Sequence, residues 1–494
     1  MKTRISKINS EQELLGRFAA AAPQIQNGAS SLNGMTNGTH HTSHFGKDLE
    51  RWEVPSDDDA ASESEENVKA DLAALQEAAQ LLRERDIPVA FPTETVYGLG
   101  ADATRSGAVK GIYAAKGRPS DNPLIVHVCD LTMLRNLLLS TSSSTSSDPI
   151  PAVYKPLIDR FWPGPLTILL PNPNSSTQLP PPVLRLAPEV TAGLSTFGCR
   201  MPASPLARSL ISLTGRPLAA PSANASTRPS PTTAQHVYDD LDGRIELILD
   251  GGACQVGVES TVVDGLCTPP VILRPGGISI EELRQCAGWE SVEKAYKDQQ
   301  QHNGSKEVPR APGMKYKHYS PKAKVILYEQ QGGENRKNLV TVEDVTQALN
   351  EIGKEEDEKV VVAIVRTRYW PFLGGIKHTA EGQQQNNNST ELNGETAGEG
   401  ESACEITEIR DAVLTGSEGR MEKAGRILDV NLGKDVGGIA RGLFAVLREM
   451  DKRGADVIFV EGVAVAGDDK DGRDDGIAAA VMNRLRKAAS EIKT

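Results

Sequence analysis

The sequence predicts an α/β protein with two folded domains. Short apolar runs rich in β-branched residues, typical of strands, alternate with segments of helical periodicity along most of the chain. A length of 494 residues exceeds that of one typical domain. A polar stretch containing Pro and Gly interrupts the alternation near residue 300, and the alternation resumes after it. These observations place one α/β domain on each side of the polar stretch.

The first domain is expected over residues 67–290. Helices are expected at 74–86, at 106–117, where Gly117 would end the helix, and at 204–213. A polar segment at 140–149 is expected to be a surface loop. Strands are expected at 87–94, 123–128, 166–171, 196–202, 217–223, 245–252, 258–265 and 270–277.

The second domain is expected over residues 322–494, after a linker at 291–321. The N-terminal residues 1–66 are rich in Asn, Gly, Ser, Thr and acids, so we expect them to be largely disordered, and we expect the same of an insertion at 378–402. No internal repeat is visible. Strands are expected at 324–329, 360–367 and 455–462, with helices at about 340–352, 434–452 and 475–490.

Composition narrows the classes of protein that fit. The net charge of −12 argues against a broad nucleic-acid-binding surface but allows a local basic pocket. The six cysteines include no CxxC pair, which disfavours a zinc site or redox dithiol and suits a reduced, cytoplasmic protein. No run approaches the roughly 18 apolar residues of a membrane helix, and the N-terminus lacks a secretory signal. Four cations near that end leave a mitochondrial form open.

General catalytic motifs are mostly missing. The chain has no Walker phosphate loop, no HExxH and no GxSxG. Residues 98–103, GLGADA, match the dinucleotide pattern G-x-G-x-x-A, but the acid expected about 20 residues later, Asp121, precedes its strand instead of ending it. His40, His41 and His44 could suggest a metal, yet a flexible tract cannot preorganise ligands. We therefore expect no metal site of the protein's own.

The stretch AAKGRPSDNPLIVHV, residues 114–128, predicts a ligand site. Lys116 and Arg118 stand with Asp121 and Asn122 in a connector that two prolines hold rigid. A plain turn needs the Gly and the prolines but not two cations, a carboxylate and an amide. The extra polar groups therefore favour a bound anion.

Other isolated cations beside Pro or Gly extend this pattern. Arg200 and Arg274 end predicted strands, and Ser222 and Asn224 lie in the polar turn of APSANAST. Because ligands bind where strand ends and loops converge, cations and hydroxyls gathered there suit a phosphate-bearing ligand. The alternative for each arginine is a pair with a surface acid.

The stretch FPTETVYGLG, residues 91–100, is a second candidate. Thr93 and Thr95 would share one face of a strand, with Glu94 on the other face. The alternative is an edge strand with satisfied hydroxyls. His127, on an apolar strand, is by itself more often a core histidine.

Seven segments in this order resemble one family. They are FPTETVYGLGADA, KGRPSDNPLIVHV, WPGPLT, RMP, APSANASTRPSPT, GVESTVVD and LRPGGI. Together they resemble the Sua5/YrdC/YwlC family of threonylcarbamoyl-AMP synthases over residues 68–290. APGMKYKHYSP and GIAAAVMNRLRKAA resemble the linker and C-terminal domain of its longer Sua5 type. The resemblance implies a YrdC-like twisted, mixed sheet with a concave cavity, and a smaller Rossmann-like C-terminal domain.

The resemblance also implies an activity. Such an enzyme is a nucleotidyltransferase that converts L-threonine, bicarbonate and ATP, with Mg²⁺ on the ATP, into L-threonylcarbamoyl-AMP, diphosphate and water. A separate transferase complex uses the product to modify adenosine 37 of tRNA. Positioning and charge neutralisation carry such a transfer, which agrees with the missing nucleophile motifs.

Roles for individual residues follow from the motif match. Lys116 and Arg118 would meet the phosphates as the catalytic cations. The ATP contacts implied are Arg118, Asn122, Thr196, Ser222, Asn224, Ser230, Arg274 and Tyr316. The threonine contacts implied are Thr95, His127, Arg200, Ala220 and Ser260.

The linker segment PGMKYKHYSP is too rich in function-bearing side chains for a passive spacer. We expect Lys315–Tyr319 to fold over the cavity as a lid, with Lys315 or Lys317 toward the phosphates and Tyr316 or His318 over the nucleotide. The alternative is a basic linker docked on an acidic surface.

Two other functions remain to be weighed. The YrdC fold is associated with RNA binding, so a tRNA- or double-stranded-RNA-binding module is the first. The second is the carbamoyl-transferring domain of a hydrogenase-maturation protein, but such proteins carry paired-cysteine zinc motifs that this sequence lacks.

Overall fold

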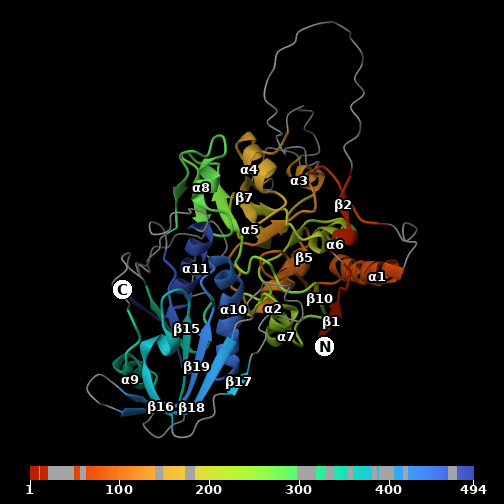
Figure 1. The fold of residues 1–494 in the computed structure, drawn as a ribbon. Coiled ribbons are helices and arrows are strands. Elements are labelled where there is room, and N and C mark those ends of the chain that lie inside the picture. The colour runs from red at the N-terminus through yellow and green to blue at the C-terminus, as the bar shows by residue number, and fades with distance from the viewer. Residues whose placement is uncertain are drawn as a thin grey trace, which may run out of the picture.

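The fold consists of two large sheets with helices packed on them (Figure 1), which confirms the predicted α/β class. The computed structural model describes residues 1–10, 12–19, 49–55, 63–139, 148–172, 184–296, 319–329, 338–353, 360–380, 386–388, 405–415, 421–464 and 475–494.

The first sheet is mixed and has 11 strands. Across the sheet they are β1 (Arg4–Lys7), β10 (Leu247–Asp250), β4 (Val89–Phe91), β5 (Gly98–Asp102), β9 (Leu218–Ala219), β6 (Ile125–His127), β8 (Thr196–Arg200), β7 (Leu166–Pro171), β11 (Thr261–Asp264), β12 (Val271–Arg274) and β13 (Glu293–Lys294). β6 and β8 run parallel with His127 opposite Arg200. Both polar side chains therefore stand at the carboxyl ends of neighbouring strands, where ligands bind in α/β sheets.

Helices cover this sheet. They are α1 (Glu63–Glu84), α2 (Ser106–Lys116), α3 (Leu131–Leu138), α4 (Lys155–Phe161), α5 (Pro188–Thr191), α6 (Pro205–Thr214), α7 (Ala234–Leu241) and α8 (Ile280–Arg284). Gly117 ends α2 in the left-handed conformation (φ 61°), and the N–H of Arg118 donates to the carbonyl of Tyr113. This tight helix end turns the chain sharply at the start of the connector that carries Arg118.

The second sheet has a parallel centre, with β19 (Met421–Asn431), β15 (Val361–Arg366), β20 (Val457–Glu461), β14 (Lys324–Tyr328) and β21 (Glu491–Lys493) side by side. β20 is buried along its whole length, as expected for a parallel strand covered on both faces. The helices here are α9 (Val342–Glu351), α10 (Val436–Lys452) and α11 (Asp475–Ala488). An antiparallel extension adds β16 (Lys377–Ala380), β17 (Asn386–Asn388) and β18 (Glu405–Thr415).

The N-terminal prediction is wrong where the structure describes this region. β1 pairs in parallel with β10 and extends the first sheet. Trp52, in the two-residue strand β3 (Trp52–Glu53), is buried, and its indole N–H donates to Ser209 Oγ (2.9 Å). Composition indicated disorder because the few apolar residues that anchor these segments are diluted by polar ones.

Two further predictions change, and the disfavoured dinucleotide pattern is accounted for. Residues 98–102 form β5, antiparallel to β4, so the G-x-G-x-x-A pattern is a strand and not a phosphate-binding turn. Parts of the expected disordered insertion, 378–380 and 386–388, pair with β18. The start of the expected linker contains β13, which pairs with β12. The rest of the linker up to 318, and most of the loop at 140–149, lie outside the described residues.

Helices α10 and α11 lie between the two sheets (Figure 1). Arg448 on α10 donates to both carboxylate oxygens of Asp240 on α7 (3.0 and 2.8 Å). Val258, from the first sheet's side, belongs to the core of the second. The two halves are therefore joined by a packed, hydrogen-bonded interface.

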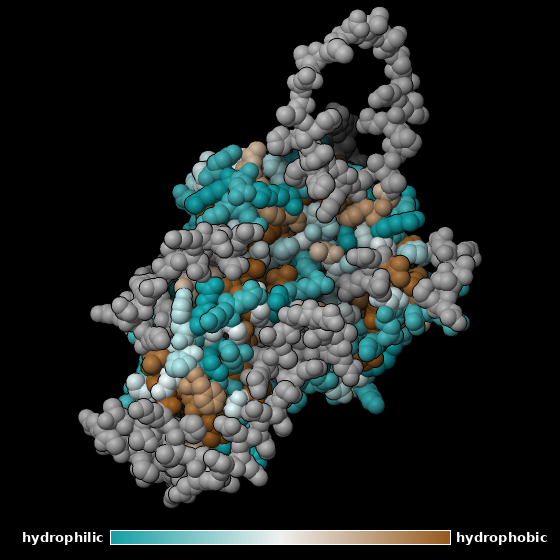
Figure 2. All heavy atoms as spheres, in the orientation of Figure 1, coloured by the Kyte–Doolittle hydropathy of each residue, from teal (hydrophilic) through white to brown (hydrophobic). Residues whose placement is uncertain are grey.

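On the face in Figure 2, hydrophobic residues occur in separate patches among hydrophilic ones. Within the part of the chain that the structure describes, no helix is both long and apolar enough to cross a bilayer.

Candidate active site

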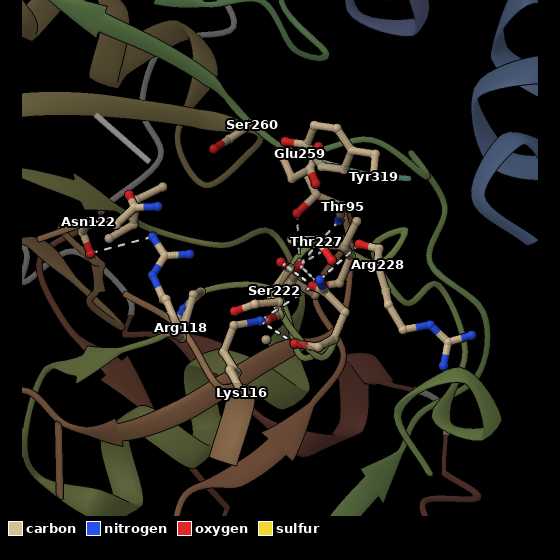
Figure 3. Close-up of a pocket in the computed structure, with 18 of the residues that line it drawn as sticks. Thr95, Lys116, Arg118, Asn122, Ser222, Thr227, Arg228, Glu259, Ser260 and Tyr319 are labelled. Carbon is tan, nitrogen blue, oxygen red and sulfur yellow. Dashed lines mark hydrogen bonds between the residues drawn. The ribbon is translucent and has the colours of Figure 1, made fainter. Parts of the chain in front are cut away.

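A cavity of about 260 Å³ opens among the loops that follow the strands of the first sheet. Its walls come from the end of α2, the loop after β4, the ends of β6, β8 and β12, and the turn after β9 (Figure 3). Segments far apart in sequence therefore converge on one space. The residues predicted from sequence that line it are Thr95, Lys116, Arg118, Asn122, His127, Arg200, Ala220, Ser222, Asn224, Ser260 and Arg274.

Three other predicted site residues are not among the residues that line the cavity. Thr196 is at the opposite end of β8 from Arg200 and does not line the space. Ser230 is fully buried behind the wall, where its hydroxyl donates to Glu259 Oε1 (2.5 Å). Tyr316 falls outside the described residues.

Lys116 holds the polar turn after β9. Its ammonium donates to the carbonyl of Ser222 and to the carbonyl of Asn224 (2.5 Å). Burial, and then the nearby charge of Arg118, lower the pKa of Lys116 well below its usual value. An anion in the cavity would oppose both effects, so this site favours a negatively charged ligand.

Arg118 and Asn122 leave polar atoms without partners. Arg118 donates to the carbonyl of Pro123 (3.1 Å), but its Nε and the Oδ1 of Asn122 are buried and make no hydrogen bond within the part of the chain described. Burial lowers the pKa of Arg118 to about 10, which keeps it charged at neutral pH. Since buried polar groups are almost always satisfied, these two atoms favour a polar ligand at this part of the wall.

Arg200 is fixed by three hydrogen bonds. It donates to the carbonyl of Gly164 (3.1 Å), to Thr95 Oγ1 (2.9 Å) and to Glu94 Oε1 (2.5 Å). Because guanidinium has five N–H donors, two remain for a ligand such as a carboxylate.

The stretch from 93 to 96 differs from the predicted strand. It is a bend in which Thr93 Oγ1 and Thr95 Oγ1 lie 2.9 Å apart, and Thr93 also donates to the carbonyl of Val96 (2.7 Å). Glu94 and Thr95 both contact Arg200 and do not face opposite ways. The bend is what lets consecutive residues hold one guanidinium.

His127 lies in the cavity wall as a neutral ring. Burial, and then the charge of Arg200, lower the pKa of His127 to about 3. Its Nδ1 lies 3.3 Å from the carbonyl of Ile125. A carbonyl can only accept, so Nδ1 carries the proton in this contact and Nε2 is the acceptor.

The pKa of His127 predicts an acid-sensitive stability. In the unfolded chain His127 has a pKa near 6.5, whereas in the folded chain its pKa is about 3. The unfolded chain therefore binds more protons below pH 6.5, and the free energy of unfolding falls as the pH drops below that value. At pH 5 the loss is expected to be about 2 kcal/mol relative to neutral pH. Urea unfolding of the wild type and of His127→Gln at pH 7.5 and 5 measures it. The variant should lose less on acidification, and an equal loss would contradict the prediction.

The wall opposite Lys116 holds Glu259, which the sequence analysis did not name, and Tyr319, the last residue of the predicted lid. Glu259 and Tyr319 line the cavity beside Ser260 (Figure 3). Arg274 donates to the carbonyl of Ser260 (2.9 Å). Glu259 lies within the quoted segment GVESTVVD, just before β11, and an acid directly followed by the hydroxyls of Ser260 and Thr261 was the available signal for it.

Tyr319 is the described end of the predicted lid. It is buried, lines the cavity and stacks on Phe444 of α10, with ring centroids 5.3 Å apart. Ser320 N–H donates to the carbonyl of Thr227, in the turn after β9 (2.8 Å). Residues 315–318 lie outside the described residues, so the lid stays a prediction.

The arrangement suits a large anionic ligand. Lys116, Arg118, Arg200 and Arg274 all line one space that also offers hydroxyls and backbone groups. No group of three or more His, Cys, Asp or Glu with metal-binding geometry occurs among the described residues, and His40, His41 and His44 lie outside them.

Two family models match most of the chain. The one described as "Telomere recombination", for Sua5, YciO and YrdC, matches residues 81–276, and "Threonylcarbamoyl-AMP synthase, C-terminal domain" matches residues 278–490. The threonylcarbamoyl-AMP synthase of Schizosaccharomyces pombe is 44% identical over 85% of this chain and 89% of its own length. The chain belongs to the Sua5 family of threonylcarbamoyl-AMP synthases.

The comparisons with Pyrococcus abyssi agree with this assignment. The threonylcarbamoyl-AMP synthase of Pyrococcus abyssi is 39% identical over 83% of this chain and 93% of the relative. The crystal structure of P. abyssi Sua5 complexed with L-threonine matches with a TM-score of 0.59 and 37% identity, covering 85% of this chain and 95% of that one. The family resemblance and the YrdC-like fold inferred from the motifs are thereby confirmed.

Proposed function

We propose that the chain is an L-threonylcarbamoyl-AMP synthase. It converts L-threonine, bicarbonate and ATP into L-threonylcarbamoyl-AMP, diphosphate and water. The names of its relatives and the threonine-bound P. abyssi structure support this activity. The product would then serve a separate transferase that modifies adenosine 37 of tRNA.

The unpartnered atoms of Arg118 and Asn122 are the observation that carries the proposal for the ATP side. Both residues line, together with Lys116, a cavity whose lining side chains carry an excess of positive charge. Lys116, Arg118 and Arg274 would hold phosphate oxygens, because fixed cations in a buried site stabilise charge without reorganisation. Asn122, Ser222 and Asn224 would hold the rest of the nucleotide, with Ser230 supporting the wall through Glu259.

The threonine side is built around Arg200. Its two remaining N–H donors suit the two oxygens of the threonine carboxylate. Thr95, His127, the backbone of Ala220 and Ser260 line the same cavity and would surround the amine and side chain.

In the reaction, the threonine amine and bicarbonate combine to a carbamate with loss of water. A carbamate oxygen attacks the α-phosphorus of ATP, the bond to the β-phosphate oxygen breaks, and diphosphate leaves. The protein's part is to align these groups and to neutralise the charge that builds up on the phosphates. Magnesium would arrive with ATP as part of the substrate, held by phosphate oxygens and water.

The proposal predicts an order of preference among amino acids. Serine lacks one methyl group, a difference worth about 1–3 kcal/mol in an apolar pocket, so discrimination against it should be modest. Valine lacks the hydroxyl and would lose its hydrogen bond to a buried polar partner such as Thr95, so discrimination should be stronger. Diphosphate release with each amino acid, with and without bicarbonate, tests both points. Release that needs neither threonine nor bicarbonate, or equal use of valine, contradicts the proposal.

A further inference from the structure

We propose that Arg484, on helix α11 of the C-terminal domain, is a positioning residue for the active site of the catalytic domain. It neutralises Glu259 and fixes the two segments that carry Ser260 and Arg274. The inference rests on the proposed function and deepens it. It assigns a task in ATP binding to helix α11, none of whose described residues lines the cavity.

Arg484 is fully buried and reaches across the domain interface. Its Nε donates to Glu259 Oε2 (3.0 Å), and its Nη1 donates to the carbonyl of Pro275 (2.5 Å). Its Nη2 lies 3.4 Å from the carbonyl of Glu259. One guanidinium therefore hydrogen-bonds to a side chain and two backbone carbonyls of the other domain.

The two residues that Arg484 binds are the immediate sequence neighbours of two site residues. Glu259 precedes Ser260, and Pro275 follows Arg274. The two segments already lie in contact, because a Cβ on Gly276 would stand 2.1 Å from the amide nitrogen of Thr261. Arg274 also donates to the carbonyl of Ser260 (2.9 Å). By binding both segments from behind, Arg484 fixes the position of each relative to the cavity.

The second task of Arg484 is electrostatic. Glu259 lines a cavity in which phosphates would bind, and its carboxylate would repel them. Burial alone would raise the pKa of Glu259, but the charges of Arg484 and Arg274 hold it below its usual value, so the group is ionised. Arg484 supplies the counter-charge from outside the cavity, which leaves the cations on the inner wall available to the ligand.

Helix α11 provides a matched control. Arg486 lies two residues further on and pairs with Glu329 (2.6 Å) inside the C-terminal domain. The two side chains are 18% and 21% exposed. Arg486→Met therefore removes an ion pair from the same helix without touching the interface with the cavity. It separates general damage to α11 from a specific effect at Glu259.

The experiment compares Arg484→Met, Glu259→Gln and the double variant with Arg486→Met. KM for ATP and kcat come from diphosphate release, and ATP affinity comes from calorimetry. Arg484→Met should raise KM and Kd for ATP by about tenfold or more, since the buried carboxylate of Glu259 then faces the phosphates without its closest counter-charge. Adding Glu259→Gln should restore most of that loss, and Arg486→Met should bind ATP as the wild type does.

Rescue by Glu259→Gln is the decisive readout, because a purely structural role for Arg484 would leave the double variant as weak as the single one. Unchanged ATP affinity in Arg484→Met, or no rescue, overturns the inference. Should Arg484→Met not fold, the double variant carries the test: wild-type-like ATP affinity supports neutralisation, and lost affinity contradicts it. Calorimetry reads ATP binding without product formation, so a wild type that binds ATP but makes no adenylate would sink the proposed function and leave this inference standing.

Discussion

Replacing Lys116 by methionine is expected to lower the rate of diphosphate release by about 10²–10³-fold. The methionine keeps most of the buried alkyl stem and removes the ammonium. That ammonium has two tasks, since it holds the carbonyls of Ser222 and Asn224 and places positive charge at the phosphates. A buried, preorganised charge is worth far more than one in water, which is why a single group has so large an effect.

Lys110 gives the control for this prediction. It lies on the same helix, its side chain is 67% exposed, and it pairs with Glu189 at 3.2 Å outside the cavity. Lys110→Met should keep the wild-type rate. Arg118→Gln should resemble Lys116→Met, and thermal unfolding should show that both variants are folded. A folded Lys116→Met enzyme with wild-type turnover would remove Lys116 from the catalytic machinery.

Arg200→Met is expected to lower the free energy of unfolding by about 3–5 kcal/mol and to abolish saturation by threonine. The stability loss follows from Glu94, which lies 2.5 Å from Arg200 and would stay buried without its partner. The binding loss follows from the two N–H donors that would meet the threonine carboxylate. Urea unfolding and threonine titrations measure the two effects separately.

The double variant Glu94→Gln with Arg200→Met separates the two effects further. It removes the uncompensated charge, so stability should recover in large part while threonine binding should not. Arg216, an exposed arginine after α6, serves as the control, and Arg216→Met should change neither quantity. Recovery of threonine binding in the double variant would show that Arg200 acts by supporting Glu94 and not by holding the substrate.

Much of the site could be predicted because its signals are local. A helix that ends in glycine next to two cations and two prolines constrains a few consecutive residues, and α2 ends at Gly117 as expected. Arg200 and Arg274 stand at strand ends, and strand ends converge whatever the details of the sheet. Such features need no knowledge of distant partners.

The remainder depends on pairings that the sequence does not announce. β5 was missed because Gly98 and Gly100 favour a turn by themselves, and it is pairing with β4 that makes them a strand. The link from Arg484 to Glu259 spans 225 positions, and no local pattern marks either residue as the other's partner. The hydrogen bond from Trp52 to Ser209 likewise has no local signal in the sequence, so the ordered part of the N-terminal segment was not predicted.

The position of β1 at the edge of the first sheet determines when this strand can pair during synthesis on the ribosome. Thr3 bonds to the carbonyl of Ile245, 242 positions later, and β1 pairs along β10 just beyond that point. At roughly 5–20 residues per second, β1 waits about 12–50 s after its own synthesis before its partner strand emerges. A polar, sparsely apolar sequence suits that wait, because an exposed strand with more hydrophobic residues would recruit other chains in the meantime.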